Sequence, residues 1–123
     1  MLELGRIVVS VSIENILEPP NIIQCNALVD TGASFLILPS AWKSRLGKLE
    51  IATQEIVQGE VGGPVKIQIE GFRPIYNEVL FVEMKPQNGT YEPLIGYIIL
   101  EQCQAAVDMV GHRLMHVKRM DLK

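Results

Sequence analysis

The residues best suited to chemistry are Asp30, Thr31 and Gly32, followed by Ala33 and Ser34 and flanked by two apolar runs. Ionising a carboxylate between two buried strands costs several kcal/mol unless hydrogen bonds or a partner stabilise the charge. Gly32 permits a sharp turn and a close approach, and the hydroxyls of Thr31 and Ser34 can bond to the amides of the loop. The sequence therefore predicts a strand–loop–strand unit that holds one carboxylate rigidly at a dry site.

Three stretches carry a resemblance to a known family. Asp30–Ser34 after an apolar strand resembles the active-site loop of aspartic proteases, and the short chain resembles their single-lobe, retroviral-type branch. Val61–Ile67 is similar to the glycine-rich flap hairpin of retroviral proteases, and Pro93–Leu100 is similar to their Leu/Ile-Gly segment before a short helix. The three matches occur in the family's order and span most of the chain.

The resemblance implies an all-β, closed barrel-like fold with one or two short helices, formed by residues 1–123 as a single retropepsin-like aspartic protease domain. It also implies a homodimer that hydrolyses peptide bonds without a metal or another cofactor. The site residues that it implies are Asp30 as the catalytic acid and base, Thr31, Gly32, Ala33 and Ser34 in the active-site loop, Val61, Gly62 and Gly63 in a substrate-binding flap, and Leu94, Ile95 and Gly96 in the cleft wall.

The number of such loops bears on the mechanism. Hydrolysis by this route needs one carboxylate to take a proton from water while a neighbouring carboxylic acid polarises the scissile carbonyl. The chain has one Asp-Thr-Gly loop, and Asp108 and Asp121 lack that context. A two-fold dimer would bring a second Asp30 opposite the first, because a symmetric interface repeats every group once per subunit. We therefore expect dimerisation to build the active site and activity to peak in acid.

Two other functions are compatible with the same residues. A retropepsin-like domain can serve as a catalytically silent module for dimerisation or peptide binding, because folds outlive their activities. It can also act as a regulatory domain that cleaves only its own parent chain. Hydrolysis of a mixed peptide library would distinguish the endopeptidase from both.

The chain departs from the retroviral pattern at three positions. Those enzymes pair an acidic residue after Asp-Thr-Gly-Ala with an arginine after Ile-Gly, whereas Ser34 and Tyr97 occupy these places here. Both partners of that ion pair are absent together, so no unpaired charge is left. Pro64 has no amide hydrogen, so a backbone bond from the predicted flap to a ligand would come from Gly62 or Gly63.

The elements around Asp30 follow from local patterns. Apolar residues alternate over 6–13 and resume over 22–29 after a proline-containing break, which predicts a hairpin of two strands. After the Asp30 loop, residues 41–47 predict a short helix with Ser40 as its N-cap and Gly47 as its end.

The second half of the chain is also predicted to be mainly strands. Alternation over 49–58 and 65–70, with turn-forming residues at 59–64, predicts a long hairpin whose glycine-bearing tip is mobile. A strand over 75–84, a polar loop over 85–90, an apolar strand end at 94–96 and a short helix over 98–103 follow. A terminal hairpin of 104–110 and 113–117 completes the prediction.

Composition excludes several classes of protein. The chain has 123 residues, 48% of them hydrophobic and 20% charged, with a net charge of −3, which argues against binding to nucleic acid. No membrane-spanning run or signal peptide is recognisable, so we expect a cytoplasmic protein with no membrane partner. Cys25 and Cys103 are expected to be reduced thiols, and His112 and His116 surface histidines rather than metal ligands.

Overall fold

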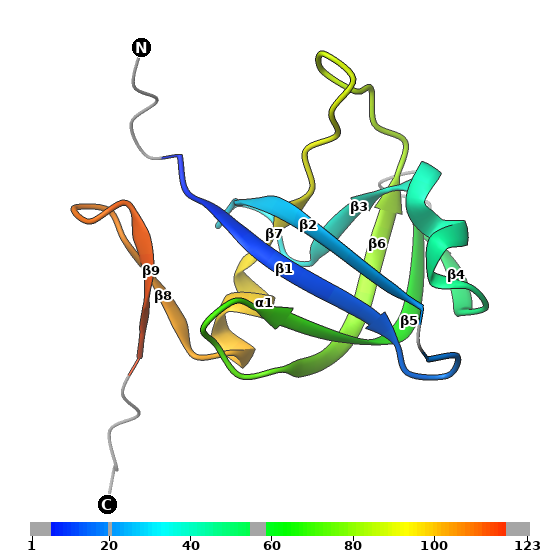
Figure 1. Cartoon of the computed structure of the whole chain (residues 1–123), viewed down its shortest axis with the longest axis horizontal. Helices are drawn as coiled ribbons and strands as arrows, with labels where there is room; N and C mark the ends of the chain where they lie inside the picture. The colour runs from blue at the N-terminus through cyan, green and yellow to red at the C-terminus, as the bar shows by residue number, and fades with distance from the viewer. Residues whose placement is uncertain (1–5, 20, 55–58, 118–123) are drawn as a thin grey trace, which may run out of the picture.

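The computed structural model describes residues 6–19, 21–54 and 59–117. Within them the chain forms nine strands and two short helices (Figure 1). In chain order these are β1 (Val8–Asn15), β2 (Ile22–Val29), β3 (Leu36–Pro39), η1 (Ser40–Leu46), β4 (Glu50–Gln54), β5 (Gly59–Ile69), β6 (Ile75–Val82), β7 (Leu94–Ile95), α1 (Tyr97–Gln102), β8 (Ala105–Asp108) and β9 (Arg113–His116).

The largest sheet closes on itself. Its seven strands lie in the order β1-β2-β7-β3-β6-β5-β4, and β1 also pairs with β5, so six of them form a ring and β4 extends the edge of β5. The predicted hairpin of the first two strands is confirmed, since β1 and β2 pair antiparallel from Val8↔Leu28 to Glu14↔Ile22. Closure leaves few free strand edges, which stabilises a barrel of this size.

The inside of the barrel is filled by the apolar residues that alternate along each strand. Val11 and Ile13 of β1 and Ile23 and Ala27 of β2 are at most 1% exposed, as the period-two pattern predicts. The other fully buried large side chains are Phe81, Leu36, Leu38, Leu46, Ile67, Ile69, Ile95, Ile99 and Val65. These residues form one core that spans all six strands and both short helices.

The helix before β4 has about the predicted length but is a 3-10 helix. Residues 40–46 form the 3-10 helix η1, whose preceding residue is Pro39 with no side-chain cap, so the prediction of Ser40 as N-cap is wrong. Gly47 ends the helix as predicted, with a φ of +77° that favours glycine. The η1 helix packs on the barrel core through Leu46, which is fully buried.

The predicted turn at 59–64 is wrong. Gly59 begins β5, and Gly62 and Gly63 are buried between β4 on one side and β6 on the other, where Gly62 pairs with both Ile51 and Val79. The strand register shifts between Gly62 and Val65, so the glycines accompany a β-bulge rather than a chain reversal. The connection from β4 to β5, residues 55–58, lies outside the described residues.

The C-terminal segments pack beside the barrel. The short helix before them is confirmed as α1, and β8 and β9 form the predicted terminal hairpin, paired from Ala105↔His116 to Asp108↔Arg113. Figure 1 shows this hairpin as a separate two-stranded sheet. The Phe72 ring stacks on His116 with centroids 4.4 Å apart, and Arg73 donates two hydrogen bonds to the Gln102 carbonyl. The first contact ties the hairpin, and the second ties α1, to the β5–β6 end of the barrel.

Candidate active site

The Asp30 loop begins where β2 ends beside β7. The Asp30 N–H donates to the Ile95 carbonyl at 2.9 Å, and the Ala33 N–H donates to the Asp30 carbonyl at 3.1 Å. The Asp30 Oδ1 atom accepts a bond of 2.9 Å from the Gly32 N–H. These bonds hold a half-buried carboxylate at the end of a strand, with its direction fixed by the backbone.

The first residues of α1 are hydrogen-bonded to the Asp30 loop. Tyr97 N–H donates to the Ala33 carbonyl at 2.9 Å, and Ile98 N–H donates to the Ser34 carbonyl at 3.1 Å. Gly96 makes this approach possible, because a Cβ there would lie 2.4 Å from the Ser34 carbonyl carbon. Backbone bonds thus join the two segments at the positions where Ser34 and Tyr97 replace the charged pair of retroviral enzymes.

The loop hydroxyls play a smaller part than the sequence indicates. Thr31 and Gly32 are exposed, while Ala33 and Ser34 are half-buried. Among the described residues, the Gly32 N–H donates its hydrogen bond to the Asp30 carboxylate rather than to a hydroxyl of Thr31 or Ser34. Thr31 is therefore a surface group beside Asp30.

An apolar row crosses the outer face of the barrel next to Asp30. Strand register places each member opposite the next, since Leu28 pairs with Val8 and Leu94, and Ile37 pairs with Leu94 and Leu80. Residues opposite each other in a sheet share a face. In order across the strands the row is Val8, Leu28, Leu94, Ile37, Leu80 and Val61. Such a row can bind apolar side chains of an extended peptide.

Two hollows lie along this row. One, of about 480 Å³, has mainly apolar walls that include Ile37, Leu80 and Leu94. The other, of about 500 Å³, includes Val8 and Leu28. Glu92 borders both, so the segment that leads into β7 separates them. Both volumes fall within the range of roughly 300–1,000 Å³ that is usual for ligand pockets.

The predicted site residues fall into two groups. Leu94, Ile95 and Gly96 come together with the Asp30 loop, since Ile95 and Gly96 bond to it directly and Leu94 stands in the apolar row. The prediction that Val61, Gly62 and Gly63 lie at a hairpin tip is wrong, because all three are in the buried first half of β5. Val61 closes the apolar row, and Gly62 lies against the side chains of Ile51 and Phe81.

The two cysteines are not reactive thiols in this structure. Burial raises the pKa of the Cys25 thiol to about 11, and it also raises the pKa of Cys103, so both thiols are protonated at neutral pH. Both cysteines are free, as expected from the sequence. In the part of the chain that the structure describes, no three His, Cys, Asp or Glu side chains come together as metal ligands would.

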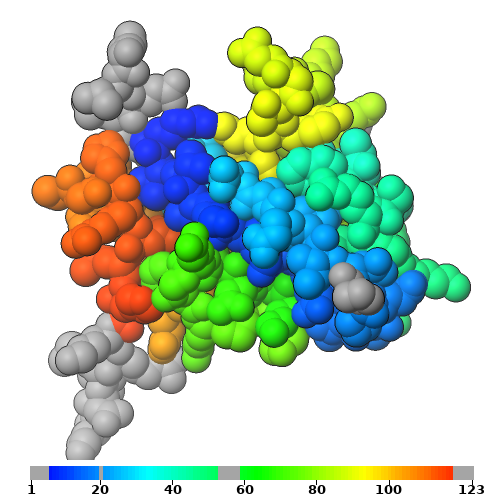
Figure 2. Space-filling model, in the orientation of Figure 1, coloured from blue at the N-terminus to red at the C-terminus, as the bar shows by residue number. Residues whose placement is uncertain are grey.

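Four residues of the second hollow carry no signal in the sequence. Arg6 and Trp42 come from the start of the chain and from η1, whereas Tyr91 and Glu92 come from the connection between β6 and β7. Figure 2 shows this connection, in yellow, standing between the start of β1 and η1. An alternating pattern identifies which face a residue occupies, but not which distant segment meets it.

Comparisons with known proteins identify the fold. No protein-family model and no curated protein sequence matches this chain. Among solved structures, the chain is similar to EIAV protease complexed with the inhibitor HBY-793, with a TM-score of 0.54 and 23% sequence identity. The match covers 83% of this chain and 92% of that one. The chain therefore has the closed, mostly β fold of retroviral proteases, with two short helices, as the sequence predicts.

In the described ranges, neither η1 nor α1 is long and apolar enough to cross a bilayer.

Proposed function

We propose that this protein is an aspartic endopeptidase whose active site forms from two copies of the chain. In this dimer the two Asp30 carboxylates share one proton across a two-fold axis. One takes a proton from the attacking water, while the other donates a hydrogen bond to the scissile carbonyl. Peptide and protein substrates would lie along the apolar row of each subunit.

The observation that carries the proposal is the anchoring of the Asp30 loop. Four backbone hydrogen bonds that involve Ile95, Gly96, Tyr97 and Ile98 fix the segment that carries the Asp30 carboxylate. Three of these bonds lie within 3.0 Å, and the fold around them is that of retroviral proteases. A loop that is fixed this firmly suits a reaction in which a small displacement of the acid costs much of the rate.

The proposed dimer assigns roles to two neighbouring elements. Exposed Thr31 and Gly32 would meet their copies at the two-fold axis, where a symmetric interface brings like residues together. The paired strands β4 and β5 would belong to the lid, because closure must exclude water and clamp an extended peptide. Glycine at Gly62 and Gly63 would then serve the packing of the hairpin rather than its opening.

The first experiment measures hydrolysis of a mixed peptide library with mass-spectrometric detection. We expect a statine-type transition-state mimic to inhibit cleavage. We also expect kcat/KM to be highest at acid pH and to fall at both lower and higher pH. Asp30→Asn keeps the shape of the side chain, so this variant should fold and dimerise while kcat/KM falls at least about a thousandfold.

The second experiment tests the shared site. Asp30→Asn chains are mixed with unmutated chains under free exchange, and specific activity is measured as a function of the mixing ratio. At equal amounts, random pairing leaves about one quarter of the dimers with two aspartates, whereas independent subunits would retain about one half of the activity. Activity that is linear in the unmutated fraction would contradict the shared site.

Other outcomes would identify the alternative functions. Peptide binding without cleavage at any pH would indicate a silent binding module. Cleavage confined to a longer parent chain, with no cleavage of added peptides, would indicate a self-processing domain.

A further inference from the structure

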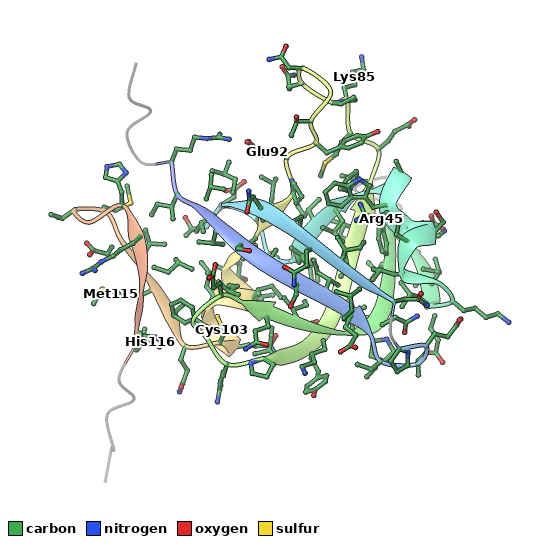
Figure 3. The ribbon with its side chains drawn as sticks, viewed as in Figure 1. Arg45, Lys85, Glu92, Cys103, Met115 and His116 are labelled. Carbon is green, nitrogen blue, oxygen red and sulfur yellow. The ribbon has the colours of Figure 1, made fainter. Side chains whose placement is uncertain are left out.

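The connection from β6 to β7 projects from the barrel. It spans residues 83–93, and Lys85 and Glu92 lie on its two limbs (Figure 3). The limbs meet at Gln87 and Thr90, whose N–H groups donate to each other's carbonyl oxygens at 2.8 and 2.9 Å. The two residues between them therefore form a tight hairpin turn.

Asn88 and Gly89 occupy this turn, with φ angles of +52° and +76°. Two positive angles are typical of a type I′ turn, for which Asn-Gly is a favoured sequence. The chain has four other asparagines, each followed by a residue that has a side chain, namely Asn15, Asn21, Asn26 and Asn77. Only at Asn88 is the next residue a glycine, whose backbone nitrogen no Cβ atom shields.

Both residues of the turn are open to water. Asn88 and Gly89 are exposed, and apart from the chain neighbours of Gly89 no atom lies within 4 Å of where its Cβ would be. In the described ranges, no hydrogen bond engages the Gly89 N–H or the Asn88 side chain. Nothing therefore holds the Gly89 nitrogen away from the side-chain amide of Asn88.

The turn can open without disturbing the barrel. The mutual bonds of Gln87 and Thr90 form an isolated bridge, and residues 83–86 and 91–93 on either side of it lie outside the strands. A pair of strands this short is marginally stable in water, so local opening costs little free energy. Opening lets the backbone rotate until the Gly89 nitrogen reaches the Asn88 Cγ atom.

Asparagine followed by glycine can then react with its own backbone. The Gly89 nitrogen gives up its proton to hydroxide or water and attacks Cγ of Asn88. The bond from Cγ to the side-chain nitrogen breaks, and that nitrogen leaves as ammonia. Water opens the resulting succinimide ring at either carbonyl group and gives aspartate or isoaspartate. Overall, an amide and water become a carboxylate and ammonium, and nothing is oxidised or reduced.

We propose that Asn88 deamidates spontaneously in the folded protein, and that the new carboxylate changes the charge of the candidate substrate cleft. Gln87 lines one hollow of the apolar row, and Gly89 and Thr90 line the other. Residues 85–92 carry one positive and one negative charge, so conversion makes this loop negative. The effect on substrates rests on the proposed endopeptidase function, whereas the modification does not.

The two products fit the turn differently. Aspartate keeps the number of backbone atoms, and Asp-Gly suits the same type of turn. Isoaspartate routes the backbone through Cβ and Cγ, so one methylene group is added between Gln87 and Thr90. We therefore expect the aspartate product to keep both bonds of the bridge and the isoaspartate product to lose them.

The first experiment incubates the folded protein at neutral and alkaline pH and follows each asparagine by mass spectrometry of its fragments. Asn88 should convert at least about tenfold faster than the other four asparagines, because only it precedes glycine. The rate should rise with pH, since the attacking nitrogen must lose its proton. A free peptide of residues 83–93 shows the rate without the fold. Folded protein that keeps Asn88 intact after this peptide has converted would overturn the proposal.

Gly89→Ala tests the attack by the next residue. Its methyl group should slow conversion at least about tenfold. The positive φ at this position disfavours alanine and loosens the turn, which by itself would speed conversion, so slowing has to come from the methyl group. Gly71→Ala is the matched control, because Gly71 also has a positive φ and open surroundings. It should leave the Asn88 rate unchanged. Equal rates in Gly89→Ala and unmutated protein would contradict this route.

The charge effect is measured with Asn88→Asp, which supplies the aspartate product directly. Two internally quenched peptides carry either Glu or Lys at one residue, and Asn88→Asp should lower the Glu-to-Lys ratio of kcat/KM about threefold, as expected for an exposed charge. Gln24→Glu adds the same charge on the outer face of β2, away from both hollows, and should leave the ratio unchanged. Equal shifts in the two variants would overturn the effect on the cleft.

The two measurements separate this inference from the proposed function. Conversion of Asn88 in a protein that cleaves no peptide would overturn the endopeptidase, and with it the effect on substrates, but would retain the modification. Peptide cleavage by a protein whose Asn88 stays intact would overturn the modification alone.

Discussion

The segment between β7 and α1, which packs against the Asp30 loop, and the first half of β5 both place glycine in crowded surroundings, but the crowding atoms differ. Around Gly96 they are backbone atoms of Ala33 and Ser34, within 2.4–2.7 Å of where a Cβ would be. Around Gly62 they are the ends of side chains, namely Ile51 Cδ1 at 2.6 Å and Phe81 Cε2 at 3.0 Å. Backbone atoms that carry a hydrogen-bonded loop cannot yield, whereas the end of a flexible side chain can rotate.

The largest effect on stability is therefore expected at Gly96. Its φ of −89° and ψ of 173° suit alanine, so the cost of Gly96→Ala comes from contact alone. We expect the free energy of unfolding to fall by about 3 kcal/mol and peptide cleavage to be lost, because the Asp30 loop must move away from α1. Urea denaturation and a peptide assay measure the two effects. A cost no greater than that of Gly62→Ala would remove the distinction between the two regions.

Asn15 is an intermediate case, in which one side chain is hydrogen-bonded to the backbone of other segments. It is fully buried, its Nδ2 donates to the Leu46 carbonyl at 2.7 Å and to the Lys48 carbonyl at 2.8 Å, and its Oδ1 accepts from the Leu17 N–H at 2.9 Å. Asn15→Ala leaves these groups without their partner, and we expect a loss of about 2 kcal/mol. Thermal unfolding measures the loss. Asn15→Asp keeps the acceptor but not the donor, so recovery by this variant would contradict the role of Nδ2.

A smaller cost is expected for Gly62→Ala, about 1 kcal/mol, since Ile51 is 39% exposed and can turn outward. Ile51→Val removes the Cδ1 atom that the new methyl group would meet. The double variant should therefore cost less than the sum of the two single ones, in a cycle measured by urea denaturation. Additive costs would show that Ile51 does not set the space around Gly62.

The smallest effect concerns pH and the inner side of β2. Burial raises the pKa of the Cys25 thiol from its ordinary value of 9.0 to about 11, against a weaker opposing effect of Arg45. Since the folded pKa exceeds the unfolded one, this contribution to stability is complete below about pH 9 and is lost as the pH rises through 11. Unmutated protein should lose stability over this interval more steeply than Cys25→Ala, as melting temperatures would record. Parallel curves would indicate that water reaches the thiol.

Local sequence was sufficient for much of the fold. The alternation in residues 6–13 and 22–29 predicts β1 and β2, because a strand with one buried face must repeat every second residue. Asp30–Gly32 and Leu94–Gly96 predict two segments that meet, and the bonds from Ile95 to Ile98 confirm that meeting. Gly47 ends a helix for a local reason, since its φ is positive.

Glycine in β5 shows where local reasoning fails. A glycine pair followed by Pro64 is typical of a turn, yet both glycines lie within a strand. Gly62 pairs with both β4 and β6, and Gly63 pairs with β4 beside a β-bulge. Glycine is needed at Gly62 because the side chains of Ile51 and Phe81 leave no space for a Cβ atom, and not because the chain reverses there. Packing against other segments decides whether a glycine marks a chain reversal or a crowded position in a strand. A single stretch of sequence holds no information on that packing.

The sequence by itself determined the acid, its loop and the strands that present it, because each depends on neighbours along the chain. Only the tertiary structure decided what surrounds that acid. The Arg6–Glu92 pair joins residues 86 positions apart, and the Trp42–Tyr91 contact joins η1 to the β6–β7 connection. Barrel closure brings these segments together, since it forces strands distant in sequence to share an edge.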